Sequence, residues 1–271
     1  MSSSLRPPQT SGPHPDFVFV VNCLRRLGST FKATHSLSSD DLSWLNIKCT
    51  QVGLDSGTPN DGGFKVVEPK PLNEMDAIAE RNNLINVDDV YRPGEYSTGN
   101  FYEASTLGDF FFHEFLEKSD ALTKKPLVEL GSWKLGPNEN DEHCTADKIG
   151  WRVAFTLHSH DDSMPADTIR FLPQSMPIKH DELLFSELWC ILKTSARQLK
   201  KNELGPDGIA PVTIVSASGR DLRIVQGYIH NNKVLVRMSE VVNTDQEDEQ
   251  NLNQLMKVGA WLLGAPCRYQ A

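Results

Sequence analysis

Residues 151–160 alternate between apolar and polar side chains, which is the pattern of a β-strand with one buried face. The odd positions from Trp151 to Leu157 are apolar, and the even positions from Thr156 to His160 are polar. Ile169 and Phe171 alternate with polar residues in the same way, and the residues between the two runs have the composition of a hairpin loop. The pattern predicts strands whose polar face carries the histidines.

The segment from residue 180 to about residue 201 has the periodicity of a helix. Apolar residues recur there at helical spacing, with acidic residues near the start and basic residues near the end, as the helix dipole favours. Strands are then predicted at residues 211–216, 221–229 and 233–242, and a closing helix at about 246–263. The paired asparagines between the last two strands predict a tight hairpin. This order predicts an α+β fold, with an antiparallel sheet that has a long helix before and a helix after the three C-terminal strands.

The first half of the chain is less regular. The apolar run at residues 16–24 fits either a buried strand or the start of a helix, and the pattern does not separate the two. Helices are predicted at residues 40–45, 73–83 and 105–118.

Three consecutive phenylalanines, at positions 110 to 112, lie within the helix predicted at residues 105–118. They cannot all face one way on a helix, so one of them contacts either a neighbouring element or the surface for a ligand or partner. Phe111 and Phe112 are therefore candidate binding residues. Tyr91 and Tyr96 are further candidates, because they lie in an aromatic loop of a composition that binding loops share with ordinary packed loops.

Charge divides the chain unevenly: residues 1–150 contribute −8 of the formal net charge of −9. We expect a disordered leader at residues 1–15, an acidic mixed region at 16–150 that either folds separately or packs on the C-terminal part, and an α+β domain at 151–271. The acidic balance is unfavourable for binding DNA or an anionic membrane. The expected partner is thus a protein or a small molecule rather than nucleic acid or a membrane, and the oligomeric state stays open.

Cysteine usage bears on the compartment. The five cysteines are scattered without a Cys-x-x-Cys pair, which is unfavourable for a disulfide framework or a zinc finger. The serine- and proline-rich leader also lacks the apolar core of a secretory signal. We therefore expect reduced thiols and a cytoplasmic protein, with the nucleus as the alternative.

His158, His160 and Asp162 are the strongest candidates for chemistry. Their spacing of two places all three side chains on one face if the strand continues to Asp162. Imidazole and carboxylate groups bind metal ions and transfer protons near neutral pH. The alternative interpretation is the solvated end of a hairpin.

This His-x-His-x-Asp pattern resembles the first five positions of the metal-binding motif of the metallo-β-lactamase superfamily, although Ser163 replaces the next histidine. It also resembles the paired histidines of cupins, without the glutamate that follows them. His160 and Asp162 together with His230 would supply the two histidines and one carboxylate of a non-haem iron oxygenase. The cofactor itself is not identified by the sequence.

Residues 211–266, about a fifth of the chain, carry a further resemblance. The run from Pro211 to Gly219, the segment Gln226-Gly227-Tyr228-Ile229 and the segment Trp261-Leu262-Leu263-Gly264 are similar to an uncharacterised family of proteins frequent in filamentous fungi. The resemblance contains no catalytic motif. It implies a soluble intracellular protein, for which an accessory role in a biosynthetic pathway is one setting and self-recognition another.

The sequence supports two hypotheses for the function. The first is a non-catalytic intracellular protein that binds a protein partner or a small ligand, because the acids, bases and nucleophiles do not converge in a recognised frame. The second is an enzyme of fungal specialised metabolism that uses His158, His160 and Asp162 as metal ligands or as general acid and base. Whether the protein is an enzyme is thus left open by the sequence.

Overall fold

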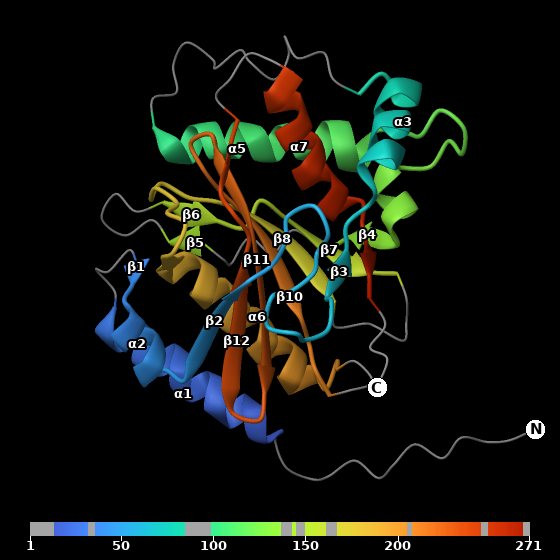
Figure 1. The fold of residues 1–271 in the computed structure, drawn as a ribbon. Helices are drawn as coiled ribbons and strands as arrows, with labels where there is room; N and C mark the ends of the chain where they lie inside the picture. The colour runs from blue at the N-terminus through green and yellow to red at the C-terminus, as the bar shows by residue number, and fades with distance from the viewer. Residues whose placement is uncertain are drawn as a thin grey trace, which may run out of the picture.

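A mixed β-sheet forms the middle layer of the structure, a computed structural model that describes residues 14–31, 36–84, 99–136, 143–144, 150–160, 167–204, 208–244 and 249–267. Seven strands lie in the order β2-β12-β11-β10-β8-β7-β4, and β13 pairs with β11 (Figure 1). Their bounds are β2 Ile47–Gln51, β4 Trp133–Leu135, β7 Phe155–Ser159, β8 Thr168–Pro173, β10 Val212–Ser218, β11 Asp221–His230, β12 Lys233–Met238 and β13 Val242–Asn243. Strands from both halves of the chain therefore share one sheet.

The predicted α+β class is confirmed, but the sheet is mixed rather than purely antiparallel. Strands β8 and β10 run parallel, and so do β12 and β2. Helix α6 (Phe185–Lys201) links β8 to β10, because a parallel pair needs a long crossover and cannot be closed by a hairpin. The long helix that the sequence predicts before the C-terminal strands is thus the crossover of a β-α-β unit.

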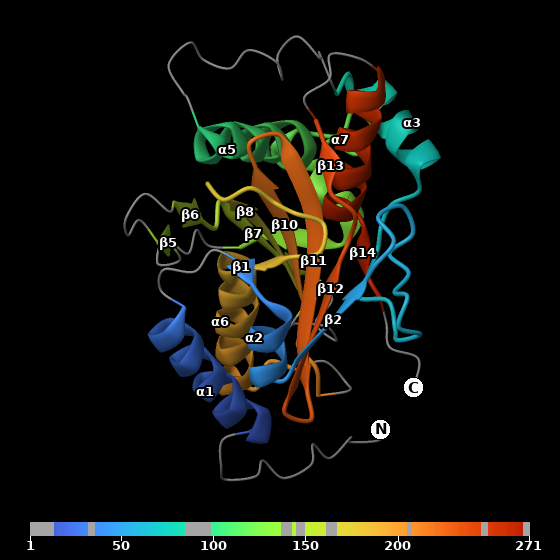
Figure 2. The ribbon, with the colours of Figure 1, turned by 60° about the vertical axis from the view of Figure 1, so that its left-hand side comes forward.

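Helices cover both faces of the sheet (Figures 1 and 2). Helices α1 (Pro15–Thr30), α2 (Ser39–Trp44) and α6 pack on one face, where they share a hydrophobic cluster with β10, β11 and β12. The other face carries α3 (Leu72–Asn82), α5 (Asn100–Phe110), η1 (Phe111–Glu117), η2 (Leu127–Gly131) and α7 (Glu249–Leu262). Within the described part of the chain, none of the helices is long and apolar enough to cross a membrane.

Three short strand pairs lie outside this sheet. They are β1 (Ser36–Leu37) with β9 (Leu183–Leu184), β3 (Val67–Glu68) with β14 (Ala265–Pro266), and β5 (His143–Cys144) with β6 (Trp151–Arg152). The β3–β14 pair connects the first half of the chain to the segment that follows α7.

The run at residues 16–24, which the pattern leaves undecided, is helical. It forms the first part of α1, with Pro15 in the first turn, where the missing amide hydrogen costs nothing. Val20, Cys23 and Leu27 are buried at spacings of three and four, and α1 packs on α6. Contact with another helix thus selects the helical alternative.

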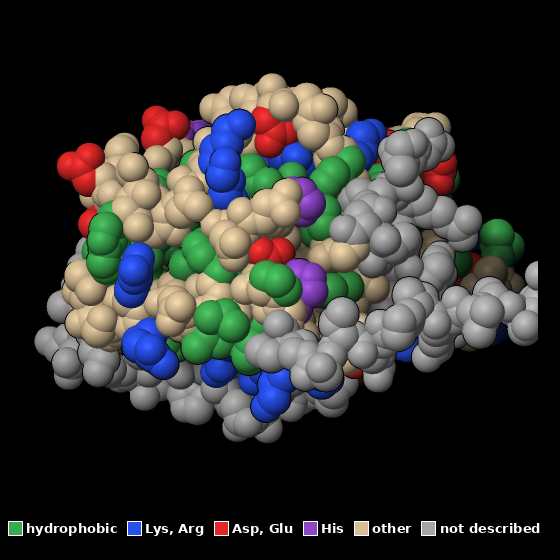
Figure 3. All heavy atoms as spheres, turned by 90° about the horizontal axis from the view of Figure 1, so that it is seen from below, with side chains coloured by type: hydrophobic (Ala, Val, Ile, Leu, Met, Phe, Trp, Pro, Cys, Tyr) green, Lys and Arg blue, Asp and Glu red, His purple; other side chains and the backbone are tan. Residues whose placement is uncertain are grey.

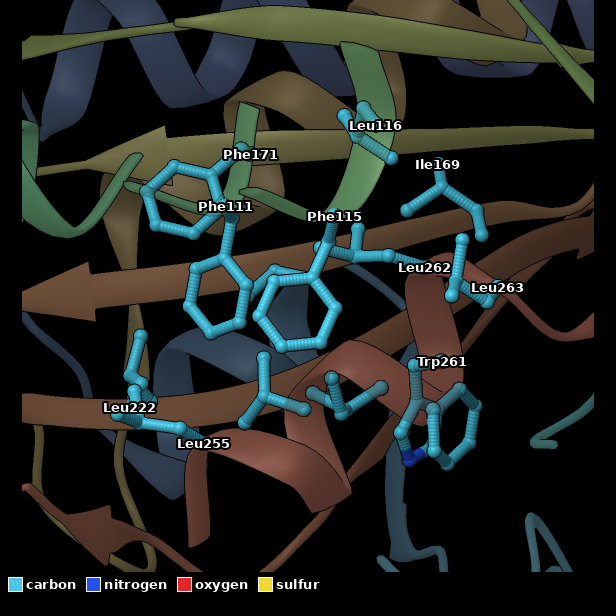
Figure 4. Close-up of a cluster of buried hydrophobic side chains, with 14 of the residues drawn as sticks. Phe111, Phe115, Leu116, Ile169, Phe171, Leu222, Leu255, Trp261, Leu262 and Leu263 are labelled. Atoms are coloured by element: carbon cyan, nitrogen blue, oxygen red, sulfur yellow. The ribbon is translucent and has the colours of Figure 1, made fainter. Parts of the chain in front are cut away.

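The predicted helix at residues 105–118 consists of two different helices. The α-helix α5 ends at Phe110, and the π-helix η1 continues from Phe111. Phe111 and Phe115 are fully buried, their ring centroids lie 5.4 Å apart, and the Phe111 ring also contacts the Phe171 ring at 5.8 Å (Figure 4). Their spacing of four residues places both rings on the core side of the helix, while Phe110 and Phe112 pack at the edge of the cluster.

Asp120 fixes the turn that follows the π-helix. Its Oδ1 accepts hydrogen bonds from Nε and Nη2 of Arg81 at 2.9 and 2.6 Å, and its Oδ2 accepts one from the Thr123 backbone N–H at 2.9 Å. The Thr123 hydrogen bond, assisted by Arg81 and Asn82, holds the pKa of Asp120 well below its usual value. The turn is thereby tied to helix α3.

Replacing Asp120 with asparagine is expected to make the fold less sensitive to acid. Because the folded pKa lies below the ordinary value of 3.8, the stability from this carboxylate is present above the unfolded pKa and is lost as the pH falls through the folded pKa. Urea unfolding from about pH 5 down to pH 2 should show a smaller loss for Asp120→Asn than for the wild type. Asp76→Asn, at an exposed position on α3, is the control, and equal losses for Asp120→Asn and wild type would contradict the assignment.

Candidate functional site

His158 lies on the sheet face that α6 covers. Its register partner is Thr168 on β8, which in turn is aligned with Val212 on β10, a member of the cluster beneath α6. The imidazole is half-buried and packs against Gly136, where an added Cβ would lie 2.5 Å from Nε2 of His158. His158 is therefore held in a packed position on β7, with Lys134 of the edge strand β4 as its other register partner.

The predicted wet face of this strand is largely covered. Thr156 is buried although the alternation places it on the polar side, because β7 lies between β8 and β4 in a sheet that has helices on both faces. The alternation also changes face within the run: Trp151 and Val153 belong to the cluster beneath α6, whereas Phe155 and Leu157 belong to the opposite cluster. A single continuous strand over residues 151–157 is therefore the wrong description.

His160 is exposed at a bend just after β7, and its backbone N–H donates to the carbonyl of Ser132 at 2.8 Å. Asp162 lies outside the described residues. In the described part of the chain, no group of three or more His, Cys, Asp or Glu side chains is arranged to hold a metal ion. The predicted metal or acid-base role of these three residues stays a prediction.

His230 ends β11, three strand positions from β7 in the sheet. At about 4.8 Å per strand the two lie roughly 14 Å apart across the sheet, whereas a metal ion needs its nitrogen ligands at about 2 Å. The combination of His230 with His160 proposed from the iron oxygenase pattern is therefore not assembled. Figure 3 shows this end of the molecule, where acidic, basic and apolar side chains are intermingled.

Of the four candidate binding residues, Tyr91 and Tyr96 lie outside the described residues. Phe111 is a core residue with no exposed surface. Phe112 is different: it is partly buried and lines a cavity of about 450 Å³. This cavity is the candidate functional site.

The cavity lies where the C-terminal turn of α5 and the start of the π-helix face strands β4, β6 and β7. Its wall is formed by Gly108, Asp109, Phe112, His113, Leu135, Gly136, Arg152, Val153, Ala154, Phe155 and Thr156. Strand β4 ends at Leu135 and pairs with β7 only over three residues, so it leaves the β6–β7 connection facing the cavity. Gly108 lets α5 come close to the sheet, because a Cβ there would lie 2.9 Å from the Phe171 ring.

Two aromatic rings form the apolar part of the wall. The Phe112 and Phe155 ring centroids are 5.8 Å apart, and Phe155 is in turn stacked on the buried Phe171 at 5.3 Å. Such spacing is favourable for aromatic pairs, so these rings are fixed in position. A planar or aliphatic group in the cavity would contact Phe112 without rearrangement of the core.

The charged residues of the wall come from opposite sides. Arg152, at the end of β6, places its guanidinium over the Phe101 ring, 5.8 Å from the centroid. Asp109 and His113 come from the helical side, and Nδ1 of His113 lies 3.2 Å from Oε2 of Glu117. Sequence reasoning missed all three. The i, i+4 spacing of Asp109, His113 and Glu117 is a signal that could have indicated one shared helix face.

A second hollow, of about 890 Å³, lies at the carboxyl ends of β2 and β12. Its lining is mostly polar loop, from Gln51 to Asn60 together with His180, Asp181, Ser239 and Glu240, and includes no aromatic residue among the described ones. Cys49 also lines it, but burial raises the pKa of its thiol to about 11. The thiol therefore stays protonated near neutral pH, unlike a nucleophilic cysteine.

Comparison with family models, curated proteins and solved structures finds no significant match for this chain.

Proposed function

We propose that this chain is a binding protein whose ligand is a small molecule seated in the cavity beside the π-helix. The observation that carries the proposal is the wall itself, in which the partly buried ring of Phe112 stands beside charged groups on both sides. Ligand sites combine apolar walls with a few polar groups that set orientation, and they measure about 300–1,000 Å³. The volume of about 450 Å³ falls within that range.

The π-helix supports the same proposal. Turns of π-helix are rare, and they are frequently found at functional sites. Here the wider turn begins at Phe111, so Phe112 and His113 face the cavity while Phe111 and Phe115 remain in the core. A regular α-helix would direct these side chains differently.

A cytoplasmic or nuclear location is supported by the free thiols of Cys23 and Cys190, which are buried and suit a reducing compartment. Membership of the fungal family and an accessory role in a fungal pathway stay predictions from the sequence.

Replacing Phe112 with alanine is expected to weaken ligand binding by about tenfold, because an aromatic contact contributes about 0.5–1.5 kcal/mol beyond its buried area. Binding of neutral single-ring fragments, such as indole and phenol, to the full chain can be followed by ligand-observed NMR and titration. Trp44→Ala removes an exposed aromatic side chain from α2, on the other face of the sheet, and serves as the control. Absence of fragment binding, or unchanged affinity in Phe112→Ala, would exclude this cavity as the binding site.

A further inference from the structure

The charges of the cavity are arranged along its length. Phe101, which holds the guanidinium of Arg152, and Asp109 are eight residues apart on α5. At 1.5 Å per residue this is about 12 Å along the helix axis. Arg152 therefore lines the cavity on the side of the start of α5, and Asp109 lines it at the end of α5, near the rings of Phe112 and Phe155.

Arg152 is prepared to bind an anion. Its guanidinium carbon lies over the Phe101 ring, 5.8 Å from the centroid, and this cation–π contact leaves the five N–H donors of the group available to a ligand. A carboxylate fits this planar group in a bidentate manner. The side chain is exposed, so a ligand can reach it without opening the fold.

Asp109 has the opposite effect at the other end. A second carboxylate on the ligand would meet a like charge there, and juxtaposed like charges repel, most strongly at low ionic strength because Asp109 is exposed. An uncharged tail faces no such repulsion. The helical side of the cavity thus discriminates against a diacid.

From this arrangement we propose that the site binds an apolar monocarboxylic acid, with its carboxylate on Arg152 and its apolar body against Phe112 and Phe155. The inference rests on the proposed function, since it names the ligand class of the same cavity. Specificity arises from both ends: Arg152 selects an anion, and Asp109 rejects a second one.

Three probes of equal chain length test the wild-type protein by calorimetric titration: octanoate, octanol and the diacid suberate. Octanoate is expected to bind at least about tenfold more tightly than either of the others, as a charge-assisted contact with arginine would provide. Equal binding of octanol and octanoate, or tighter binding of suberate, would overturn the proposal.

Two variants test which residue contacts each end of the ligand. Arg152→Gln should reduce octanoate affinity to the level of octanol without changing octanol, and Asp109→Asn should raise the affinity for suberate relative to octanoate. Arg25→Gln, at an exposed arginine of α1 on the opposite side of the sheet, is the control for a general change in charge. Unchanged octanoate affinity in Arg152→Gln would refute the assignment of the carboxylate.

The experiments distinguish an error in the ligand class from an error in the proposed function. If indole and phenol bind in a manner that depends on Phe112 but octanoate has no advantage over octanol, the ligand class is wrong and the binding site stands. If neither the fragments nor octanoate bind, the proposed function fails as well. Because the charged positions are exposed, melting temperatures of the variants close to that of the wild type are expected.

Discussion

Replacing Glu187 with alanine is expected to lower the free energy of unfolding by about 3–5 kcal/mol, the cost of leaving a buried charge without its partner. Glu187 and Arg223 are both fully buried and form two hydrogen bonds, Nε to Oε1 at 2.9 Å and Nη2 to Oε2 at 2.5 Å. Oε2 also accepts the backbone N–H of Leu184 at 2.9 Å, at the start of α6. Loss of the carboxylate therefore leaves both a guanidinium and a helix end unsatisfied.

Chemical denaturation of the purified variant measures this loss. The informative control is the double variant Glu187→Leu with Arg223→Met, which removes both charges and should recover part of the stability, because a buried pair often contributes little more than apolar residues of similar size. Recovery should be incomplete, since Arg223 also donates to the carbonyls of Lys179 and Glu182. A Glu187→Ala variant within about 0.5 kcal/mol of the wild type, the usual range for surface changes, would contradict the buried pair.

Replacing Phe115 with alanine is expected to cost a similar amount, about 3–5 kcal/mol, because it opens a cavity in a packed core. The ring is fully buried and lies 5.4 Å from the Phe111 ring and 5.6 Å from the Phe110 ring, centroid to centroid. It also lies directly over Gly259 of α7, where an added Cβ would be 2.5 Å from the ring. Thermal or urea unfolding monitored by circular dichroism gives the measurement.

Gly259 provides a second test of the contact between Phe115 and α7. In the wild type, Gly259→Ala should destabilise by about 1–3 kcal/mol through overpacking against the ring. In the Phe115→Ala background the same methyl group has room, and alanine is the better helix former by about 1 kcal/mol. The double variant should therefore be more stable than the sum of the two single effects predicts, and simple additivity would contradict the contact. Leu122→Ala, at an exposed side chain outside the core clusters, should change stability by no more than about 0.5 kcal/mol.

Local periodicity predicted the C-terminal elements well. The helix and strands predicted at residues 211–216, 221–229, 233–242 and 246–263 correspond to β10, β11, β12 and α7, with ends shifted by a few residues. The hairpin at the paired asparagines is confirmed, and both residues have positive φ, 51° for Asn231 and 56° for Asn232. The helix predicted at residues 40–45 is also present as α2, with a capping box between Ser38 and Asp41. These features depend on neighbouring residues, which is why one sequence suffices to predict them.

The sequence did not predict which distant strands pair with each other. Whether a strand pairs in parallel depends on where the chain returns after a helix, and nothing in the β8 or β10 pattern records that direction. The recruitment of β2 beside β12 joins residues far apart in sequence. The same limit explains the candidate site, since Arg152, Asp109 and Phe112 line one cavity only because α5 and the π-helix pack beside the sheet.

His158 and His160 show what the sequence determined and what the tertiary structure added. The sequence by itself determined that His158 and His160 lie at the end of a strand at a spacing of two, because the period of a strand is a local property. It also determined the α+β class, through the order of helical and strand periods. Only the tertiary structure decided that His158 packs against Gly136 and that the cavity forms beside the π-helix instead. Burial and convergence arise from contacts between distant segments, and a local pattern does not specify which segments meet.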